Sequence, residues 1–457
     1  MTDTKDALGK TVSRRRFLSI AALAGVGAAG GSSLLAACGA GSSGGPGGAA
    51  GGGGGGASGE ATGPIVWASW ANPGEGERFK AFSADYTKQH GNKVTWQQVV
   101  GDYQSKLLTQ LAGGSAPDAF YVGDGNMAKF IESGQLEDLT SFLETPESPV
   151  KATDTYPGLI KWCKPVGGDG LFGIPVDCNP KVFWFNQDML GAAGVTTNPA
   201  ALFEGGSWNQ AALDDLLNKV KGTGKRGMVV QANWFDFTSI VTTFGGTAFD
   251  EESGECVWDK DQKAMAAFTW LFDHFKNETI TYGGSLPKGQ GVDALFYGQQ
   301  LATCQWGRWI LPNLKKLKFG YDIAPMPSED GKTVMPAAVY CAAMSVNTKA
   351  QDKQAALMFL GRYVNKDGQR FRLSGGGNAV PSTPGLPEVV TEGNLPPHAS
   401  YFEEAAKVGY AIPLKIASNA TVATNLETTM DKIIKGGADA QTFATQTAAF
   451  INSGGKS

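Results

Sequence analysis

The chain contains few histidines and no closely spaced cysteine pair. Its three histidines, His90, His274 and His398, stand alone in the sequence. Zinc sites need histidine or cysteine ligands at characteristic short spacings, so we expect no metal and no cofactor. Apart from Cys38, the cysteines are expected to be small buried residues, with at most one or two disulfides. These five are Cys163, Cys178, Cys256, Cys304 and Cys341.

Clustered positive charge is also missing from most of the chain. The formal net charge is −4 over 457 residues, of which 18% are charged. The first 37 residues hold five cationic and two acidic side chains, so the remainder carries −7. Because phosphate backbones are bound by clustered Lys and Arg, this acidic body argues against nucleic acid as a partner.

No long, strongly apolar run is present either. The most apolar segment near the N-terminus, Leu18 to Ala37, contains four Gly and three Ser. A membrane-spanning helix needs ~20 predominantly apolar residues, which argues against a transmembrane anchor. Arg14, Arg15 and Arg16 precede this run, and together they resemble a twin-arginine export signal. We therefore expect residues 1–37 to be a signal peptide that sends the protein out of the cytoplasm.

Glycine and serine dominate the segment after the signal. The signal ends in Leu35-Ala36-Ala37-Cys38, which resembles the lipobox of bacterial lipoproteins. In such proteins the cysteine thiol takes a diacylglycerol, and two or more acyl chains give stable membrane anchoring. Residues 39–63 are almost entirely small and cannot bury a core, so residues 38–63 are expected to be a lipidated cysteine and its flexible tether. The implied location is the outer face of the cytoplasmic membrane.

Strands and helices are expected to alternate from residue 64 onwards. The hydrophobic spacing predicts strands at 64–70, 93–100 and 117–122, and helices at 77–88, 103–111 and 127–133. This pattern predicts a mostly parallel α/β sheet, with a binding site beyond the carboxyl ends of its strands.

Five segments in order carry a family resemblance that covers residues 64–457. They are APDAFYVGDGNMAKFIESGQLEDLT (116–140), LFGIPVDCNPKVFWFNQDMLGAAGV (171–195), SWNQAALDDLLNKVK (207–221), FYGQQLATCQWGRW (296–309), and the stretches from YDIAPMPSEDGK (321–332) to NAVPS (378–382). Together they resemble the family 1 extracellular solute-binding proteins of ABC importers, of the maltose-binding type. No single motif is decisive, but five in this order are specific.

The resemblance implies the α/β fold of periplasmic binding proteins, in which two lobes are joined by hinge crossovers and enclose a central ligand cleft. The first lobe would comprise 64–174 plus 343–378, and the second 178–338 plus 382–457. Hinges would lie near 174–177, 339–341 and 379–382. The implied function is capture of a mono- or oligosaccharide and its delivery to the permease of an ABC importer. We expect a monomer with no enzymatic activity.

A sugar site needs flat aromatic rings for C–H faces and polar side chains for hydroxyls. Trp70, Asn72 and Glu75 come at and after the end of the first expected strand, and Trp70 is a candidate for either the cleft or the core. Asp124 follows the third expected strand. Its position in a turn before a helix fits a helix cap, whereas the family resemblance favours an acidic contact with the ligand. The remaining candidates follow the hinge motif Gly-Ile-Pro or match family contact loops. They are Asp177, Asn179, Asn233, Trp234, Trp306, Arg308 and Trp309.

Two other function classes fit the same features. A lipid-anchored extracellular glycoside hydrolase would share the signal, the tryptophans and the acidity, but it needs two carboxylates at a fixed separation that the sequence does not identify. A binding module for a receptor rather than a transporter would have the same sequence features.

This chain departs from the family pattern at Val176 and at Cys304. Arg308 is a candidate for binding a phosphate or carboxylate on the ligand.

Overall fold

A computed structural model describes residues 63–71, 74–165 and 167–456. Every element below belongs to one compact unit that ends at Ser457. The expected signal peptide, Cys38, most of the tether and Asn72 lie outside the described residues. Within the described part, no helix is long and apolar enough to cross a membrane.

The largest sheet has five strands in the order β2-β1-β3-β10-β4. Its strands are β1 (Ile65–Ser69), β2 (Val94–Gln98), β3 (Ala119–Gly123), β4 (Ile174–Pro180) and β10 (Val339–Val346). β1 runs parallel to β2 and β3, as the alternating strands and helices predicted. β10 is antiparallel to both β3 and β4, so the complete sheet is mixed.

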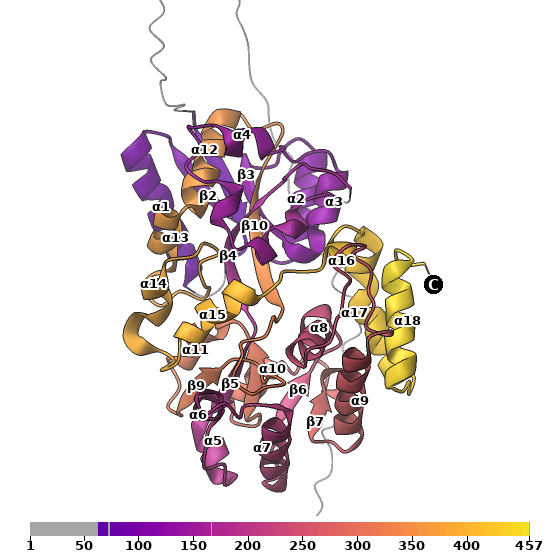
Figure 1. Cartoon of the computed structure of the whole chain (residues 1–457). Helices are drawn as coiled ribbons and strands as arrows, with labels where there is room; N and C mark the ends of the chain where they lie inside the picture. Colours follow the sequence, from indigo (N-terminus) through magenta and orange to yellow (C-terminus); the bar gives the residue numbers. More distant parts are fainter. Residues whose placement is uncertain (1–62, 72–73, 166, 457) are drawn as a thin grey trace, which may run out of the picture. The chain divides into compact units, whose positions relative to one another are not determined.

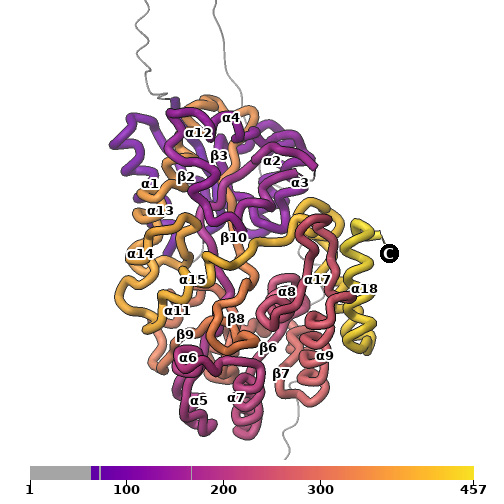
Figure 2. The backbone as a smooth tube through the Cα atoms, in the orientation of Figure 1, coloured from indigo at the N-terminus to yellow at the C-terminus, as the bar shows by residue number. Residues whose placement is uncertain are grey.

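Helices from two distant parts of the sequence pack around this sheet. They are α1 (Glu75–His90), α2 (Tyr103–Ala112), α3 (Met127–Glu132), α4 (Thr140–Glu144), α12 (Lys353–Val364) and α13 (Lys366–Leu373). Figures 1 and 2 show orange α13 beside indigo α1, a contact between segments almost 300 residues apart. Trp67 of β1 is fully buried and meets the rings of Phe79 on α1 and of Phe359 and Tyr363 on α12.

Two smaller sheets occupy the middle of the sequence. One is antiparallel in the order β8-β5-β9, and the other pairs β6 with β7 in parallel. The strands are β5 (Val182–Asn186), β6 (Met228–Val230), β7 (Ile280–Tyr282), β8 (Thr303–Trp306) and β9 (Tyr321–Ala324). Their helices are α5 (Gln187–Ala192), α6 (Pro199–Glu204), α7 (Gln210–Gly222), α8 (Trp234–Thr243), α9 (Gln262–Lys276), α10 (Val292–Tyr297) and α11 (Leu311–Leu314).

The C-terminal part of the chain is helical. Its helices are α14 (Pro387–Thr391), α15 (Ser400–Val408), α16 (Leu414–Ala417), α17 (Ala420–Lys435) and α18 (Ala440–Asn452). α18 packs on both α17 and α9, and α17 also contacts the short 3₁₀ turn η1 (Asp124–Asn126) that follows β3. This last contact brings a helix from the end of the sequence to the carboxyl end of an early strand (Figure 1).

Three crossover segments meet at Cys178. In the β4–β10 ladder Cys178 lies opposite Cys341, and its backbone also exchanges two hydrogen bonds of 2.8 Å with Val380. Ser382 adds a hydrogen bond of 2.9 Å from its hydroxyl to the Pro175 carbonyl. The segments that the sequence analysis named as hinges therefore lie side by side.

Burial of the aromatic and sulfur-containing residues follows ordinary packing. Five of the eleven tryptophans are fully buried, namely Trp67, Trp162, Trp184, Trp208 and Trp258. The five described cysteines are free and buried, as expected of small apolar side chains. Burial raises the pKa of the Cys163 and Cys304 thiols well above the usual value, which keeps them in the protonated form.

Candidate functional site

Five aromatic rings gather where α8, β10 and β8 meet, and we call them the aromatic cluster: Trp234, Phe235, Trp306, Trp309 and Tyr340. The Tyr340 ring stacks flat on Phe235 at 3.9 Å between centroids and meets Trp234 at 5.7 Å. On its other side it meets Trp309 at 5.7 Å, and Trp309 meets Trp306 at 6.1 Å. Trp306, Trp309 and Tyr340 are only partly buried, so their rings retain contact with solvent.

Local structure explains how these rings are held. Asn233 caps α8 by accepting a hydrogen bond of 2.7 Å from the Asp236 amide, which fixes Trp234 in the first turn of the helix. Gly307 separates Trp306 from the short turn η6 (Arg308–Ile310) that contains Trp309. A Cβ at Gly307 would collide with the Trp309 ring and with Asn179, so only glycine permits this close approach.

A buried ion pair lies beneath the aromatic cluster. Lys181 donates to Asp236 at 2.5 Å, and both side chains are almost fully buried. The Lys181 ammonium also lies 4.3 Å from the centre of the Phe235 ring, on which Tyr340 stacks. Burial lowers the pKa of Lys181, while the nearby Asp236 carboxylate opposes that shift. The pair thus packs against the rings, and the charge of Lys181 is balanced by Asp236 rather than offered to a ligand.

Two carboxylates, Asp124 and Glu427, adjoin the aromatic cluster. Asp124 stands in η1, after β3, and burial raises its pKa to about 7, with a further contribution from Glu427. Glu427 is on α17, and burial followed by the charge of Asp236 raises its pKa. Asp236, Asp124 and Glu427 all contribute to a raised pKa of Tyr340, whose first cause is burial. The turn η1 contacts both α17 and β10, so the two carboxylates lie near the strand that carries Tyr340.

A second acidic group lies on β4. Asp177 is 3.6 Å from a guanidinium nitrogen of Arg372, which is itself fully buried. Arg372 also donates to the Val176 carbonyl at 2.6 Å and lies over the Tyr363 ring. Burial raises the pKa of Asp177 to about 7 although Arg372 opposes that shift, and Glu75 adds to it. Asp177, Glu75 and Arg372 thus form a coupled group.

The structure brings most of the sequence candidates near these two groups. Trp70 is half-buried and meets the rings of Tyr103 and Tyr121 edge-on, so its role in the core is at least partial. Asn179 is half-buried on β4, and its Oδ1 accepts a hydrogen bond of 3.0 Å from the Arg308 amide. Asn72 is outside the described residues.

Arg308 was expected as a candidate for binding an anionic group on the ligand, but the structure places its side chain in the interior. Its side chain is 0% exposed, and two guanidinium nitrogens donate to the carbonyls of Ala379 and Val390 at 3.0 and 3.2 Å. Burial lowers its pKa to about 10. A guanidinium so enclosed serves the packing of the chain after α13, which argues against direct contact with a ligand.

Tyr340, Glu427 and Arg372 were missed by the sequence analysis. Tyr340 falls inside the expected hinge 339–341, so an aromatic residue at a crossover was the available signal. Glu427 stands in an ordinary amphipathic helix, and nothing in its neighbours in sequence distinguishes it from a solvated charge. Arg372 follows another arginine on α13, where a surface position is the usual expectation.

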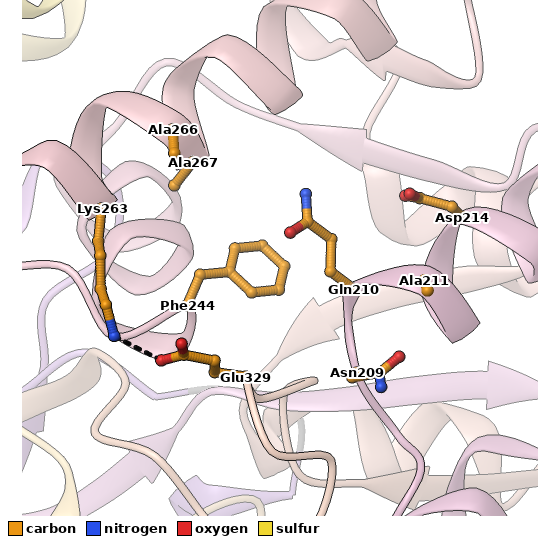
Figure 3. Close-up of a pocket in the computed structure, with 9 residues that line it drawn as sticks. All are labelled: Asn209, Gln210, Ala211, Asp214, Phe244, Lys263, Ala266, Ala267 and Glu329. Carbon is orange, nitrogen blue, oxygen red and sulfur yellow. Dashed lines mark hydrogen bonds and ion pairs between the residues drawn. The ribbon is translucent and has the colours of Figure 1, made fainter.

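A cavity lies elsewhere in the described part of the chain. It measures about 500 Å³ and is bordered by α7, α9 and the residue that ends α8, Phe244. Figure 3 shows the Phe244 ring between Gln210 of α7 and Lys263 of α9, with Lys263 paired to Glu329 at 2.6 Å. None of the sequence candidates borders this cavity.

Comparison with solved structures shows the fold. An ABC substrate-binding protein from Listeria monocytogenes, solved in complex with cycloalternan, matches with a TM-score of 0.71 and 20% identity. That match covers 86% of this chain and 99% of the other. The GacH receptor of Streptomyces glaucescens, solved unliganded and with acarbose, matches with a TM-score of 0.69, 16% identity and the same coverage. The predicted two-lobe α/β fold is thereby confirmed.

Sequence comparison gives the family. A curated relative, an uncharacterized lipoprotein in the oleD 5′ region of Streptomyces antibioticus, is 28% identical over 138 residues. That match spans 30% of this chain and 28% of the relative. The sequence model of one family covers residues 70–370, about two thirds of the chain. The protein therefore belongs to the family of bacterial extracellular solute-binding proteins.

Proposed function

We propose that this protein is an extracytoplasmic solute-binding lipoprotein that captures a carbohydrate and delivers it to an ABC importer permease. The observation that carries the proposal is the aromatic cluster beside Asp124 and Glu427 in a chain of this family. Partly exposed rings offer flat apolar faces to sugar C–H groups, and carboxylates accept strong hydrogen bonds from hydroxyls. Similar structures were solved with cycloalternan and with acarbose, which supports a carbohydrate here.

The ligand would be held between two lobes, comprising 64–174 plus 343–378 and 178–338 plus 382–457. Asp124 belongs to the first of these lobes, whereas Trp309 and Glu427 belong to the second. A ligand that contacts both lobes favours the closed arrangement because it binds that arrangement more tightly. The meeting of the three crossovers at Cys178 supports a hinge at this level of the chain.

The other predicted contacts remain part of the proposal. Trp70, Glu75, Asp177 and Asn179 would border the ligand on the side of the Arg372 group, and Asn233 and Trp234 on the side of α8. Export by the twin-arginine signal, lipidation of Cys38 and a monomeric state are proposed from the sequence, and the curated lipoprotein relative supports the anchor.

A glycoside hydrolase is the weaker alternative. Hydrolases of this kind use two carboxyl groups whose environments push their pKa values apart, one kept protonated and the other ionised. Asp124 and Glu427 are both shifted upwards, and their mutual charge contributes to the shift of Asp124. This arrangement suits hydrogen bonding to a bound solute better than acid–base catalysis.

Calorimetric titration of a Trp309→Ala variant with a panel of neutral and amine-bearing carbohydrates tests the proposal. Loss of the ring should weaken binding of the sugar that the parent protein binds by roughly tenfold or more, the effect of one stacking contact of 1–2 kcal/mol. Trp270→Ala is the matched control, because Trp270 is equally half-buried but contacts Phe244 and His274 away from the site. Unchanged affinity in Trp309→Ala, or cleavage of the sugar, would contradict the proposal.

A further inference from the structure

We propose that the preferred ligand carries a basic nitrogen, so that it is an amino sugar or an amine-bearing oligosaccharide rather than a neutral one. This inference rests on the proposed function, because it names the class of carbohydrate that the same site would take. It is carried by the juxtaposition of Asp124 and Glu427 with the rings of Trp309 and Tyr340, where both charges lack a cationic partner in the described structure.

Asp124 has an unused hydrogen-bonding oxygen. Its Oδ1 accepts a hydrogen bond of 2.8 Å from the Gly125 amide. Its Oδ2 is buried and makes no hydrogen bond within the usual geometric limits, although the Cys341 amide nearby stabilises the charged form. A buried carboxylate oxygen without a partner costs free energy, and a ligand that donates a hydrogen bond would remove that cost.

The charged groups that face this site from the surrounding elements are predominantly acidic. Glu427 faces Asp124 from α17, and Asp236 acts on both Glu427 and Tyr340 from α8. Two nearby cations have acidic partners of their own: Lys181 pairs with Asp236 at 2.5 Å, and Lys415, on α16 packed against η1, lies 3.9 Å from Glu255. Once these pairs are counted as neutral, Asp124 and Glu427 leave an uncompensated negative charge. A neutral sugar would leave it uncompensated, whereas a protonated amine would offset it.

The aromatic cluster favours the same ligand. A cation over the face of Trp or Tyr within about 6 Å of its centre is attracted by the ring quadrupole. Lys181 over Phe235 already uses one ring face in this way, on the buried side. The Trp309 and Trp306 rings keep solvent contact, so their faces are available to a second cation brought by the ligand.

Glu427 is open to solvent. It stands on α17, which packs against η1, the turn that contains Asp124. Glu427 can therefore meet a ligand that enters from solvent and reaches Asp124.

Matched ligand pairs test the inference. Calorimetry at pH 8 would compare 6-amino-6-deoxymaltose with maltose and 6-amino-6-deoxyglucose with glucose, because a primary amine on C6 stays largely protonated at that pH. Because charge-assisted hydrogen bonds are roughly twice as strong as neutral ones, we expect the amine member of at least one pair to bind about tenfold more tightly. That preference should shrink below about pH 7, where Asp124 becomes protonated.

Glu427→Gln keeps the shape of the side chain and should remove most of the amine preference, measured as the ratio of the affinities for the two members of each pair. Glu404→Gln on α15 is the matched control, because burial also raises the pKa of Glu404 but it lies beside Glu403 and Lys407. Equal or tighter binding of the neutral members would overturn the inference and leave the proposed function standing. If no member of any pair binds, the inference is contradicted and carbohydrate capture is also put in doubt. If calcium chloride alone stabilises the protein, the two carboxylates bind a metal ion rather than an amine, and the inference is contradicted.

Discussion

At the scale of single residues, charge and burial decide which polar side chains are free to meet a ligand. Arg308 and Asp124 were both candidates on sequence grounds, and they differ in how their polar atoms are used. Two nitrogens of Arg308 are bound to backbone carbonyls, whereas one oxygen of Asp124 has no hydrogen bond. The same comparison separates Asp177, which is paired with Arg372, from Glu427, which faces other carboxylates.

Replacing Arg308 should therefore affect stability. Arg308→Ala removes two buried hydrogen bonds and leaves a cavity, so we expect a loss of about 3 kcal/mol or more in the free energy of unfolding. Urea denaturation measures it. Arg370→Ala is the control, since Arg370 is exposed and its ion pairs with Asp367 and Glu388 should contribute less than about 1 kcal/mol. Full stability of Arg308→Ala together with loss of ligand affinity would restore a binding role for this side chain.

The raised pKa of Asp124 predicts a pH-dependent gain on substitution. An acid whose pKa rises from 3.8 to about 7 on folding holds its proton better in the folded state, so its contribution to stability is lost as pH increases through that window. At pH 8, Asp124→Asn should be more stable than the parent by on the order of 2 kcal/mol, allowing for partial solvent contact. At pH 4 the difference should vanish.

Asp177→Asn is the contrasting variant for the same measurement. The pKa of Asp177 is also raised to about 7, but this substitution removes a counter-charge from the buried guanidinium of Arg372, so we expect a smaller gain at pH 8 than for Asp124→Asn. Urea unfolding of both variants at pH 4, 6 and 8 separates the two effects. A destabilised Asp124→Asn at pH 8 would show that its carboxylate stabilises the fold and would weaken the assignment of Asp124 to the ligand.

At the scale of elements, the first half of the large sheet could be predicted from the sequence. Strands expected at 64–70, 93–100 and 117–122 occur as β1, β2 and β3, because each combines an apolar run with turn residues on both sides. Just beyond α3, Gly134 adopts a φ of 65°, a left-handed conformation that commonly follows the end of a helix. The antiparallel insertion of β10 between β3 and β4 could not be predicted, because strand pairing over 200 residues leaves no local signal.

The cap of α8 offers a test at this scale. Asn233 holds the first turn that contains Trp234, so Asn233→Ala should cost about 1 kcal/mol in the free energy of unfolding and loosen the aromatic cluster. Asn233→Asp keeps an accepting oxygen at the helix start and should retain nearly all the stability. Thermal unfolding of the three proteins measures the difference. Equal losses in both variants would mean that the amide group, rather than the cap, is what the site requires.

At the scale of the whole molecule, the site is assembled from segments far apart in the chain. Asp124, Trp309, Tyr340 and Glu427 are contributed by η1, η6, β10 and α17. The resemblance led to the first two because they follow recognisable motifs. Tyr340 and Glu427 enter only when β10 and α17 are packed beside η1, a tertiary arrangement that hydrophobic periodicity does not encode.

A crystal structure of the protein with the tightest-binding carbohydrate tests the central claim most directly. The account predicts sugar rings against Trp309 and Tyr340, with polar groups of the ligand within hydrogen-bond distance of Asp124 or Glu427. A ligand bound instead in the 500 Å³ cavity between α7 and α9, with the aromatic cluster empty, would contradict it.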